Sequence, residues 1–162
     1  MKSKQIKVMA VTAILMAFNI VLSSFGVPVP GGHMYLNDVI ICTAAILLNP
    51  FGAFMVGLLF YPTPMFVSLV THGLQAVVIS LATRRLGKDR PSGSAIGVTI
   101  GAVIMVVGYS LGRAFIYSTP EYALLKLPFQ IAQAVVGAVV GWLLCWKCKI
   151  AELYEKRFGI MS

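Results

Sequence analysis

The sequence predicts an all-α integral membrane protein, built as a compact six-helix bundle with both termini in the cytoplasm. Hydrophobic residues make up 59% of the 162 residues and charged residues 11%, and the mean hydropathy is +0.89. This composition is too apolar for a soluble domain of this length. Apolar runs of membrane-spanning length recur along the chain. The basic residues cluster between these runs rather than on one soluble face, so the formal charge of +8 does not indicate nucleic-acid binding.

The basic clusters determine the expected topology. All lysines and arginines except Arg113 and Lys126 lie near the amino terminus, within residues 84–90, or after residue 146. Because basic loops stay on the cytoplasmic side, an even number of crossings must separate each pair of clusters. The amino-terminal lysines and the apolar run that follows them also fit a secretory signal peptide, but the later clusters favour an uncleaved first helix.

Four apolar runs approach the roughly 20 residues that a bilayer requires. They are expected as helices over residues 8–24, 65–83, 95–117 and 128–146. The region between the first two is harder to assign, because a single helix over residues 37–60 would place the loop at residues 84–90 outside. A break at Asn49–Pro50, where proline disfavours a helix, gives two short helices over residues 37–48 and 51–60. These are either short crossings or a re-entrant hairpin whose broken backbone must be shielded from lipid.

A single transmembrane domain over residues 1–162 follows, with outer loops at residues 25–36, 61–64 and 118–127. The tail, residues 147–162, has apolar residues near helical spacing, and we expect it to lie on the inner membrane surface. The CWKC segment next to it has no second cysteine pair and no nearby histidine, so interfacial packing is favoured over a redox or metal site. The sequence has no paired intramembrane carboxylates, HExxH, GxSxG or phosphate-binding glycine loop. We therefore expect neither an enzyme nor a bound cofactor or metal.

Polar residues inside the predicted helices gather on single faces. Tyr109, Arg113 and Tyr117 are spaced four apart on the fifth helix, which places them in one stripe. Ser68, His72 and Gln75 share one side of the fourth helix, and Gln130 and Gln133 do so at the start of the sixth. All of these lie in the expected extracellular half. Because polar groups are costly inside a membrane, such convergence indicates either a binding site or internal hydrogen bonds.

The candidate substrate-binding residues come from these faces and from the outer loops. They are Tyr35, Asn37, Tyr61, His72, Gln75, Tyr109, Arg113, Tyr117, Gln130 and Gln133. A pocket needs an apolar body with a few fixed donors and acceptors, and this set supplies aromatic rings, amides and a cation. The cation favours a substrate with a carboxylate, a phosphate or an electron-rich heteroaromatic edge. In the alternative interpretation Arg113 snorkels to the outer interface or pairs with Asp38, and His72 and Gln133 only bond neighbouring helices.

In the first helix, AILMAFNIV spaces Ala13, Ala17 and Val21 four residues apart. Three further segments are GGHMYLNDVIICTAAILLNPFGA, VTHGLQAVV, and MVVGYSLGRAFIYS followed by LPFQIAQAVVGAVV. In this order, the segments resemble the docking stripe, the first loop with the second helix, the fourth helix, and the last two helices of substrate-binding S components. These are subunits of energy-coupling factor (ECF) vitamin transporters. The branch indicated takes vitamin B6, the thiamin pyrimidine precursor or riboflavin-like cargo, although relatives tend to carry an acid at Arg113 and asparagine at Gln130.

The resemblance implies a multi-pass protein of the bacterial plasma membrane that captures a vitamin-like small molecule on its outer face. Vitamin B6 or the thiamin pyrimidine precursor is favoured, with riboflavin or pantothenate as alternatives. The implied partners are a transmembrane coupling (T) subunit and two cytoplasmic ATPases, and the chain itself has no Walker motif. Ala13, Ala17 and Val21 are the implied contact with the coupling subunit, along which the bundle topples to deliver its cargo.

Two other functions fit the same residues. The first is a structural or regulatory membrane subunit whose polar groups only lock the helices together, so that replacing Arg113 affects assembly but not uptake. The second is a self-sufficient proton-coupled carrier, which requires a titratable group deep in the membrane. His72 is the candidate for that group, and uptake without ATP would favour the carrier.

Overall fold

The computed structural model describes residues 2–30, 32–58, 65–87 and 90–158. Its helices are α1 (Lys2–Ser24), α2 (Asn37–Leu47), α3 (Pro50–Gly57), α4 (Met65–Leu86), α5 (Pro91–Gly112), the π-helix η1 (Arg113–Tyr117), α6 (Pro120–Trp146) and α7 (Ile150–Phe158), and its strands are β1 (Gly26–Val29) and β2 (Gly32–Tyr35). The predicted all-α class is confirmed. Within this part of the chain four segments are long and apolar enough to cross a membrane, namely Gln5–Ser24, Phe66–Leu86, Pro91–Tyr117 and Pro120–Trp146.

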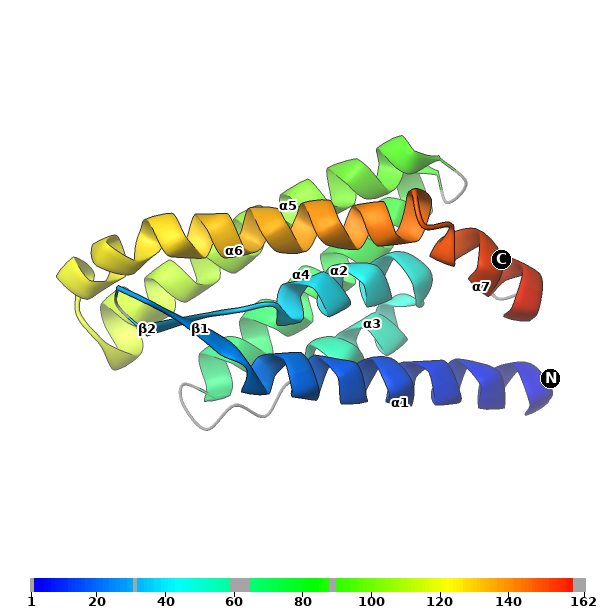
Figure 1. Ribbon diagram of the computed structural model, residues 1–162, viewed down its shortest axis with the longest axis horizontal. Coiled ribbons are helices and arrows are strands. Elements are labelled where there is room, and N and C mark those ends of the chain that lie inside the picture. Colours follow the sequence, from blue (N-terminus) through cyan, green and yellow to red (C-terminus); the bar gives the residue numbers. More distant parts are fainter. Residues whose placement is uncertain (1, 31, 59–64, 88–89, 159–162) are drawn as a thin grey trace.

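The long helices run roughly along one axis, and the two termini lie at the same end of it (Figure 1). The α4–α5 connection lies at that end too, so the three basic clusters of the sequence share one end of the molecule. The β-hairpin and the turn between η1 and α6 lie at the opposite end. This separation of charge along the long axis is what the positive-inside rule expects of a membrane protein.

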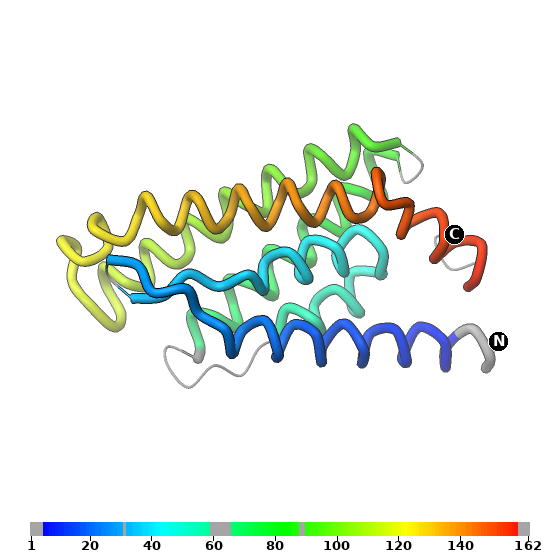
Figure 2. Tube along the Cα trace, in the orientation of Figure 1, coloured from blue at the N-terminus to red at the C-terminus, as the bar shows by residue number. Residues whose placement is uncertain are grey.

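The predicted break at Asn49–Pro50 is present, and α2 and α3 turn back on each other there (Figure 2). The backbone groups freed at the break are bonded: the Asn49 side chain accepts from the Gly52 amide at 2.7 Å, and Ser80 Oγ donates to the Leu48 carbonyl at 2.8 Å. With 11 and 8 residues, the two helices are about 16 and 12 Å long. Neither is long enough to cross a hydrocarbon layer of about 30 Å alone.

Helix α6 begins earlier than the sequence predicts. The predicted outer loop at residues 118–127 is wrong, because α6 starts at Pro120 instead of residue 128. Thr119 accepts from the Tyr122 amide at 3.3 Å, Pro120 occupies the first turn, and Glu121 places a negative charge there. These are the residue types that favour a helix start. Pro128 therefore lies inside the helix.

Other boundaries also shift. Helix α5 begins at Pro91 rather than residue 95, and the end of the predicted fifth helix, up to Tyr117, is the π-helix η1. The expected outer loop at residues 25–36 contains an antiparallel β-hairpin, in which Gly26 pairs with Tyr35 and Val29 with Gly32. The φ angle of Gly32 is 122°, a backbone conformation that glycine adopts most readily. The loop at residues 61–64 lies outside the described residues.

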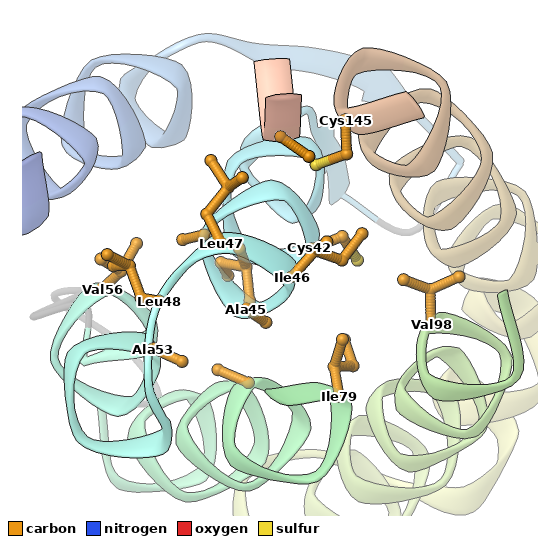
Figure 3. Close-up of a cluster of buried hydrophobic side chains, with 14 of the residues drawn as sticks. Cys42, Ala45, Ile46, Leu47, Leu48, Ala53, Val56, Ile79, Val98 and Cys145 are labelled. Atoms are coloured by element: carbon orange, nitrogen blue, oxygen red, sulfur yellow. The ribbon is translucent and has the colours of Figure 1, made fainter. Parts of the chain in front are cut away.

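The apolar core occupies the half of the bundle nearest the termini. Helix α2 lies at its centre, with Cys42 and Ile46 on the side toward Ile79 of α4, Val98 of α5 and Cys145 of α6 (Figure 3). Leu48, just after α2, lies on the other side, beside Val56 of α3. The buried histidine and glutamines lie further toward the hairpin end, as His72 does on α4 and Gln133 on α6. The polar residues buried in the other half are small hydroxyl residues, such as Ser80 and Ser94. The bundle is thus divided into an apolar half and a polar half, and the polar half holds the site.

Glycines allow the helices to approach closely around α2. A Cβ added at Gly141 would meet Cys42 Cβ at 2.8 Å, and one added at Gly101 would meet Ile79 at 2.5 Å. Both contacts are closer than side chains tolerate, so any larger residue would displace Cys42 of α2 or the Ile79 side chain of α4. The glycines spaced four apart on α5 and α6 serve internal packing, as small residues do in membrane bundles.

Candidate functional site

A partly enclosed cavity of about 260 Å³ lies in the polar half of the bundle. The hairpin and helices α2, α4, α5, η1 and α6 all contribute to its wall. Of the candidate binding residues, the following line it: Tyr35, Asn37, His72, Tyr109, Arg113, Tyr117, Gln130 and Gln133. The faces identified in the sequence therefore converge on one space, although they come from separate helices. Tyr61 lies outside the described residues.

Gln75 does not line the cavity but bonds His72, which does. Its Nε2 donates to Asp38 Oδ1 at 3.2 Å, and its Oε1 lies 2.9 Å from His72 Nδ1. Because the amide nitrogen of Gln75 faces Asp38, its oxygen faces the histidine, which makes Nδ1 the protonated ring nitrogen. In the neutral form of the ring, Nε2 is then an acceptor.

Asp38 is the centre of a buried hydrogen-bond network. Only 1% of this residue is exposed, and its second carboxylate oxygen accepts from Gln133 Nε2 at 2.6 Å. Gln133 Oε1 in turn accepts from the Tyr35 amide at 3.0 Å, which ties the hairpin to α6. His72 Nδ1 lies 3.7 Å from Asp38 Oδ1. The network joins β2, α2, α4 and α6, and it holds a carboxylate at a depth where an unbonded one would be very costly.

The suggested ion pair between Arg113 and Asp38 is wrong. Arg113 Nη1 instead donates to Gln130 Oε1 at 2.7 Å, and its guanidinium lies 5.9 Å from the centre of the Tyr117 ring. Gln130 is itself anchored, because its Nε2 donates to the carbonyls of Met105 and Val106 at 3.3 and 3.0 Å. Arg113 is the first residue of the π-helix, a feature that often marks functional sites.

Aromatic and hydroxyl groups form another part of the wall. The rings of His72 and Tyr109 meet edge to face with their centres 5.2 Å apart, and the Tyr109 hydroxyl bonds to Ser68 Oγ at 2.6 Å. These contacts fix the tyrosine ring, so the cavity has a preformed apolar surface bordered by polar groups. This is the general character of a small-molecule site.

Lys126 and Tyr122 also line the cavity, and sequence reasoning missed both. Lys126 is only 5% exposed, and its Nζ donates to the His33 carbonyl of the hairpin at 2.7 Å. Both residues fall within the expected outer loop at residues 118–127, because the predicted sixth helix begins at Pro128. The Thr119–Pro120–Glu121 start signal would have placed Lys126 on the same helical face as Gln130 and Gln133.

The small residues of α1 lie away from the cavity. Ala13, Ala17 and Val21 are all exposed, Val21 by 52%. Helix α1 packs against α2 and α3 and leaves its remaining surface open.

The fold and the cavity define a class: a helical membrane protein that holds a small, polar molecule within one half of its bundle. A family model described as the ECF-type riboflavin transporter, S component, matches residues 3–149. The chain belongs to this family, whose members are substrate-binding subunits of vitamin transporters and not enzymes. A comparison with curated proteins gives no match.

Proposed function

We propose that this protein captures a water-soluble vitamin or vitamin precursor on the extracellular side of the bacterial plasma membrane. It delivers that cargo inward together with a transmembrane coupling subunit and two cytoplasmic ATPases. The observation that carries the proposal is the cavity: the polar faces of separate helices meet in one preformed space within a chain of the S-component family.

The position of the cavity supports this direction of transport. The basic clusters and both termini lie at one end of the bundle, while the hairpin and the cavity lie toward the other. With basic residues on the cytoplasmic side, both termini are cytoplasmic, the cavity faces the extracellular half, and residues 1–162 form one transmembrane domain. Six helices, α1 to α6, then make up the membrane bundle, with α7 on the inner surface.

The size of the cavity favours a small cargo. Its volume of about 260 Å³ lies just below the range of roughly 300–1,000 Å³ usual for ligand pockets. A molecule with one ring or a short chain fits such a space better than the three fused rings and ribityl chain of riboflavin. Vitamin B6 and the thiamin pyrimidine precursor remain the favoured single-ring candidates, and pantothenate is the short-chain alternative.

The first experiment identifies the cargo. The protein is purified in detergent, denatured, and any released small molecule is identified by mass spectrometry; the emptied protein is then titrated calorimetrically with a panel of vitamins and precursors. We expect one class to bind at micromolar concentration or tighter. Failure of every compound to bind at millimolar concentration would contradict the proposal and favour a structural subunit.

The second experiment tests the partners. Vesicles that contain this protein alone should bind the cargo but not accumulate it, whereas vesicles that also contain a coupling subunit and ATPases should accumulate it when ATP is supplied. The buried pair of His72 and Asp38, at 3.7 Å, is the feature that a proton-coupled carrier would use. Accumulation driven by a proton gradient in vesicles without partners would establish that carrier instead.

A further inference from the structure

We infer that the cargo carries a carboxylate, which binds between Arg113 and Lys126, and a hydrogen-bond donor that reaches Asn37. This inference rests on the proposed function and specifies the chemistry of the same cavity. It selects acids over neutral vitamins of similar size. Among the candidates above it therefore places pantothenate before pyridoxine and the thiamin pyrimidine precursor, which reverses the order favoured under the proposed function.

The two cations line one cavity and are both held by neutral groups. Arg113 donates to the Gln130 side chain and Lys126 to the backbone carbonyl of His33, each at 2.7 Å. Among the residues that the structure describes, the ion pairs are His72 with Asp38 and Lys156 with Glu152. Neither cavity cation takes part in one, so protein acids do not neutralise the positive charge of this wall.

Asp38 does not supply the missing negative charge. Both of its oxygens accept hydrogen bonds from glutamines, and it lies beneath the cavity rather than on its wall. Its nearest basic neighbour is His72, from a different helix than either cation. Glu121, at the start of α6, is exposed and bonds its own helix terminus and Thr119.

Two cations without an ion-pair partner are costly within a membrane bundle unless a ligand supplies negative charge. Arginine has five N–H donors and lysine three. Arg113 bonds Gln130 and Tyr117, and Lys126 bonds the His33 carbonyl, all neutral groups, so donors of both cations remain for a ligand. A carboxylate has two oxygens that can accept from both side chains in short, charge-assisted hydrogen bonds. A neutral cargo would leave both charges uncompensated in a partly dehydrated site.

The donor half of the inference comes from Asn37. Its Oδ1 is buried and has no hydrogen-bond partner within the described part of the chain, and the residue lines the cavity. A buried acceptor without a partner costs free energy, which a hydroxyl or N–H group of the cargo would recover. His72 Nε2 offers a second acceptor on the same wall. The site therefore matches a molecule with an acid group and a separate hydroxyl or N–H group.

The experiment compares acids with neutral analogues of the same skeleton. Pantothenate is titrated against pantothenol, nicotinate against nicotinamide, and 4-pyridoxate against pyridoxine, all with the wild-type protein. Because a hydrogen bond to a charged group contributes about 1.5–3 kcal/mol, we expect the acid of the best pair to bind about 10- to 100-fold more tightly. Sodium chloride and inorganic phosphate serve as competitors, to show whether any small anion satisfies the site.

Variants then assign the preference to the two cations. Arg113→Gln and Lys126→Met should each reduce the acid-to-neutral ratio about tenfold, while Arg113→Lys should keep most of it. Lys156→Met removes an exposed cation of α7 and should leave the ratio unchanged. The comparison of ligands needs only the wild-type protein, so a variant that fails to fold does not prevent a decision.

The outcomes separate this inference from the proposed function. Equal or tighter binding of the neutral member in every pair that binds overturns the inference but leaves vitamin capture standing. An unchanged ratio in both charge-removing variants overturns it as well, as does inorganic phosphate that competes as strongly as the acid. If neither acids nor neutral vitamins bind, both the inference and the proposed function fail.

Discussion

Asp38 shows how a single residue organises the cavity from beneath. Its carboxylate accepts hydrogen bonds from Gln75 and Gln133, and these glutamines in turn orient His72 and the Tyr35 amide. Every polar group in this hydrogen-bond network is buried or partly buried, so each one needs a hydrogen-bond partner. The carboxylate thus acts through the amides it holds rather than by touching the cargo.

Replacement of Asp38 by asparagine should destabilise the protein. One of its two acceptor oxygens becomes an NH₂ group, which would face the NH₂ group of a glutamine. A buried donor left unpaired costs about 1–3 kcal/mol, so the thermal unfolding midpoint in detergent should fall measurably, and cargo affinity should fall with it. Glu155→Gln, at an exposed position on α7, is the matched control. An unfolding midpoint equal to the wild type would show that the carboxylate is not needed to hold the amides.

For single residues, the sequence predicts the helix face on which a side chain lies better than it predicts the hydrogen-bond partner of that side chain. Helical periodicity alone places Tyr109, Arg113 and Tyr117 in one stripe, and the structure has them on one cavity wall. Which group Arg113 bonds depends on the rotation and depth of α6, which the periodicity of α5 does not determine. For this reason the alternative interpretation, in which Arg113 pairs with Asp38, is wrong, and the sequence does not predict the pair with Gln130.

The β-hairpin forms one side of the cavity wall, and two hydrogen bonds hold it on α6. Lys126 donates to the His33 carbonyl, and Gln133 accepts from the Tyr35 amide. The turn depends on Gly32, whose φ of 122° strains any residue with a side chain.

Gly32→Ala should therefore weaken cargo binding more than it weakens the fold. The backbone strain is of order 1–3 kcal/mol and would be relieved by displacement of the hairpin, while the apolar core lies in the other half of the bundle. Calorimetry should report an affinity about tenfold lower or more, with little change in the unfolding midpoint. Val27→Ala, at an exposed position of β1, should change neither. Wild-type affinity in Gly32→Ala would mean that the hairpin does not shape the site.

Elements were predictable where their local signals agreed. The break at Asn49–Pro50 was found because proline acts on its own neighbours, whatever the tertiary structure. The sequence analysis expects residues 25–36 only as an outer loop, although the Gly31–Gly32 pair between alternating residues is a known hairpin signal. The predicted start of α6 at Pro128 is wrong because a membrane helix can hold an internal proline.

For the whole molecule, the proposed orientation can be tested with the native cysteines. Cys148 is exposed near the carboxyl end, while Cys42 and Cys145 are buried. A membrane-impermeant maleimide should label Cys148 in inside-out vesicles and leave intact cells unlabelled. A Val27→Cys, Cys148→Ser double variant should show the reverse pattern, because the hairpin lies at the other end. Labelling of Cys148 from outside intact cells would invert the proposed topology.

The surface of α1 is the region most open to a partner. Only 11% of the α1 membrane window is buried, compared with 56% for that of α4. Ala13, Ala17 and Val21 lie at exposed positions of this helix, and none of them lines the cavity. Small side chains there permit close approach of another helix, whereas a large one would hold it away.

Ala17→Trp should accordingly separate capture from transport. Calorimetry should give wild-type cargo affinity, because the substitution is remote from the cavity wall, while the coupling subunit should no longer co-purify and ATP-driven uptake should fall to background. Val135→Trp places the same side chain at an exposed position of α6 and should preserve uptake. If Ala17→Trp transports normally, the coupling subunit must bind another surface of the bundle. If it loses cargo binding instead, α1 contributes to the cavity in a way that its packing against α2 and α3 does not explain.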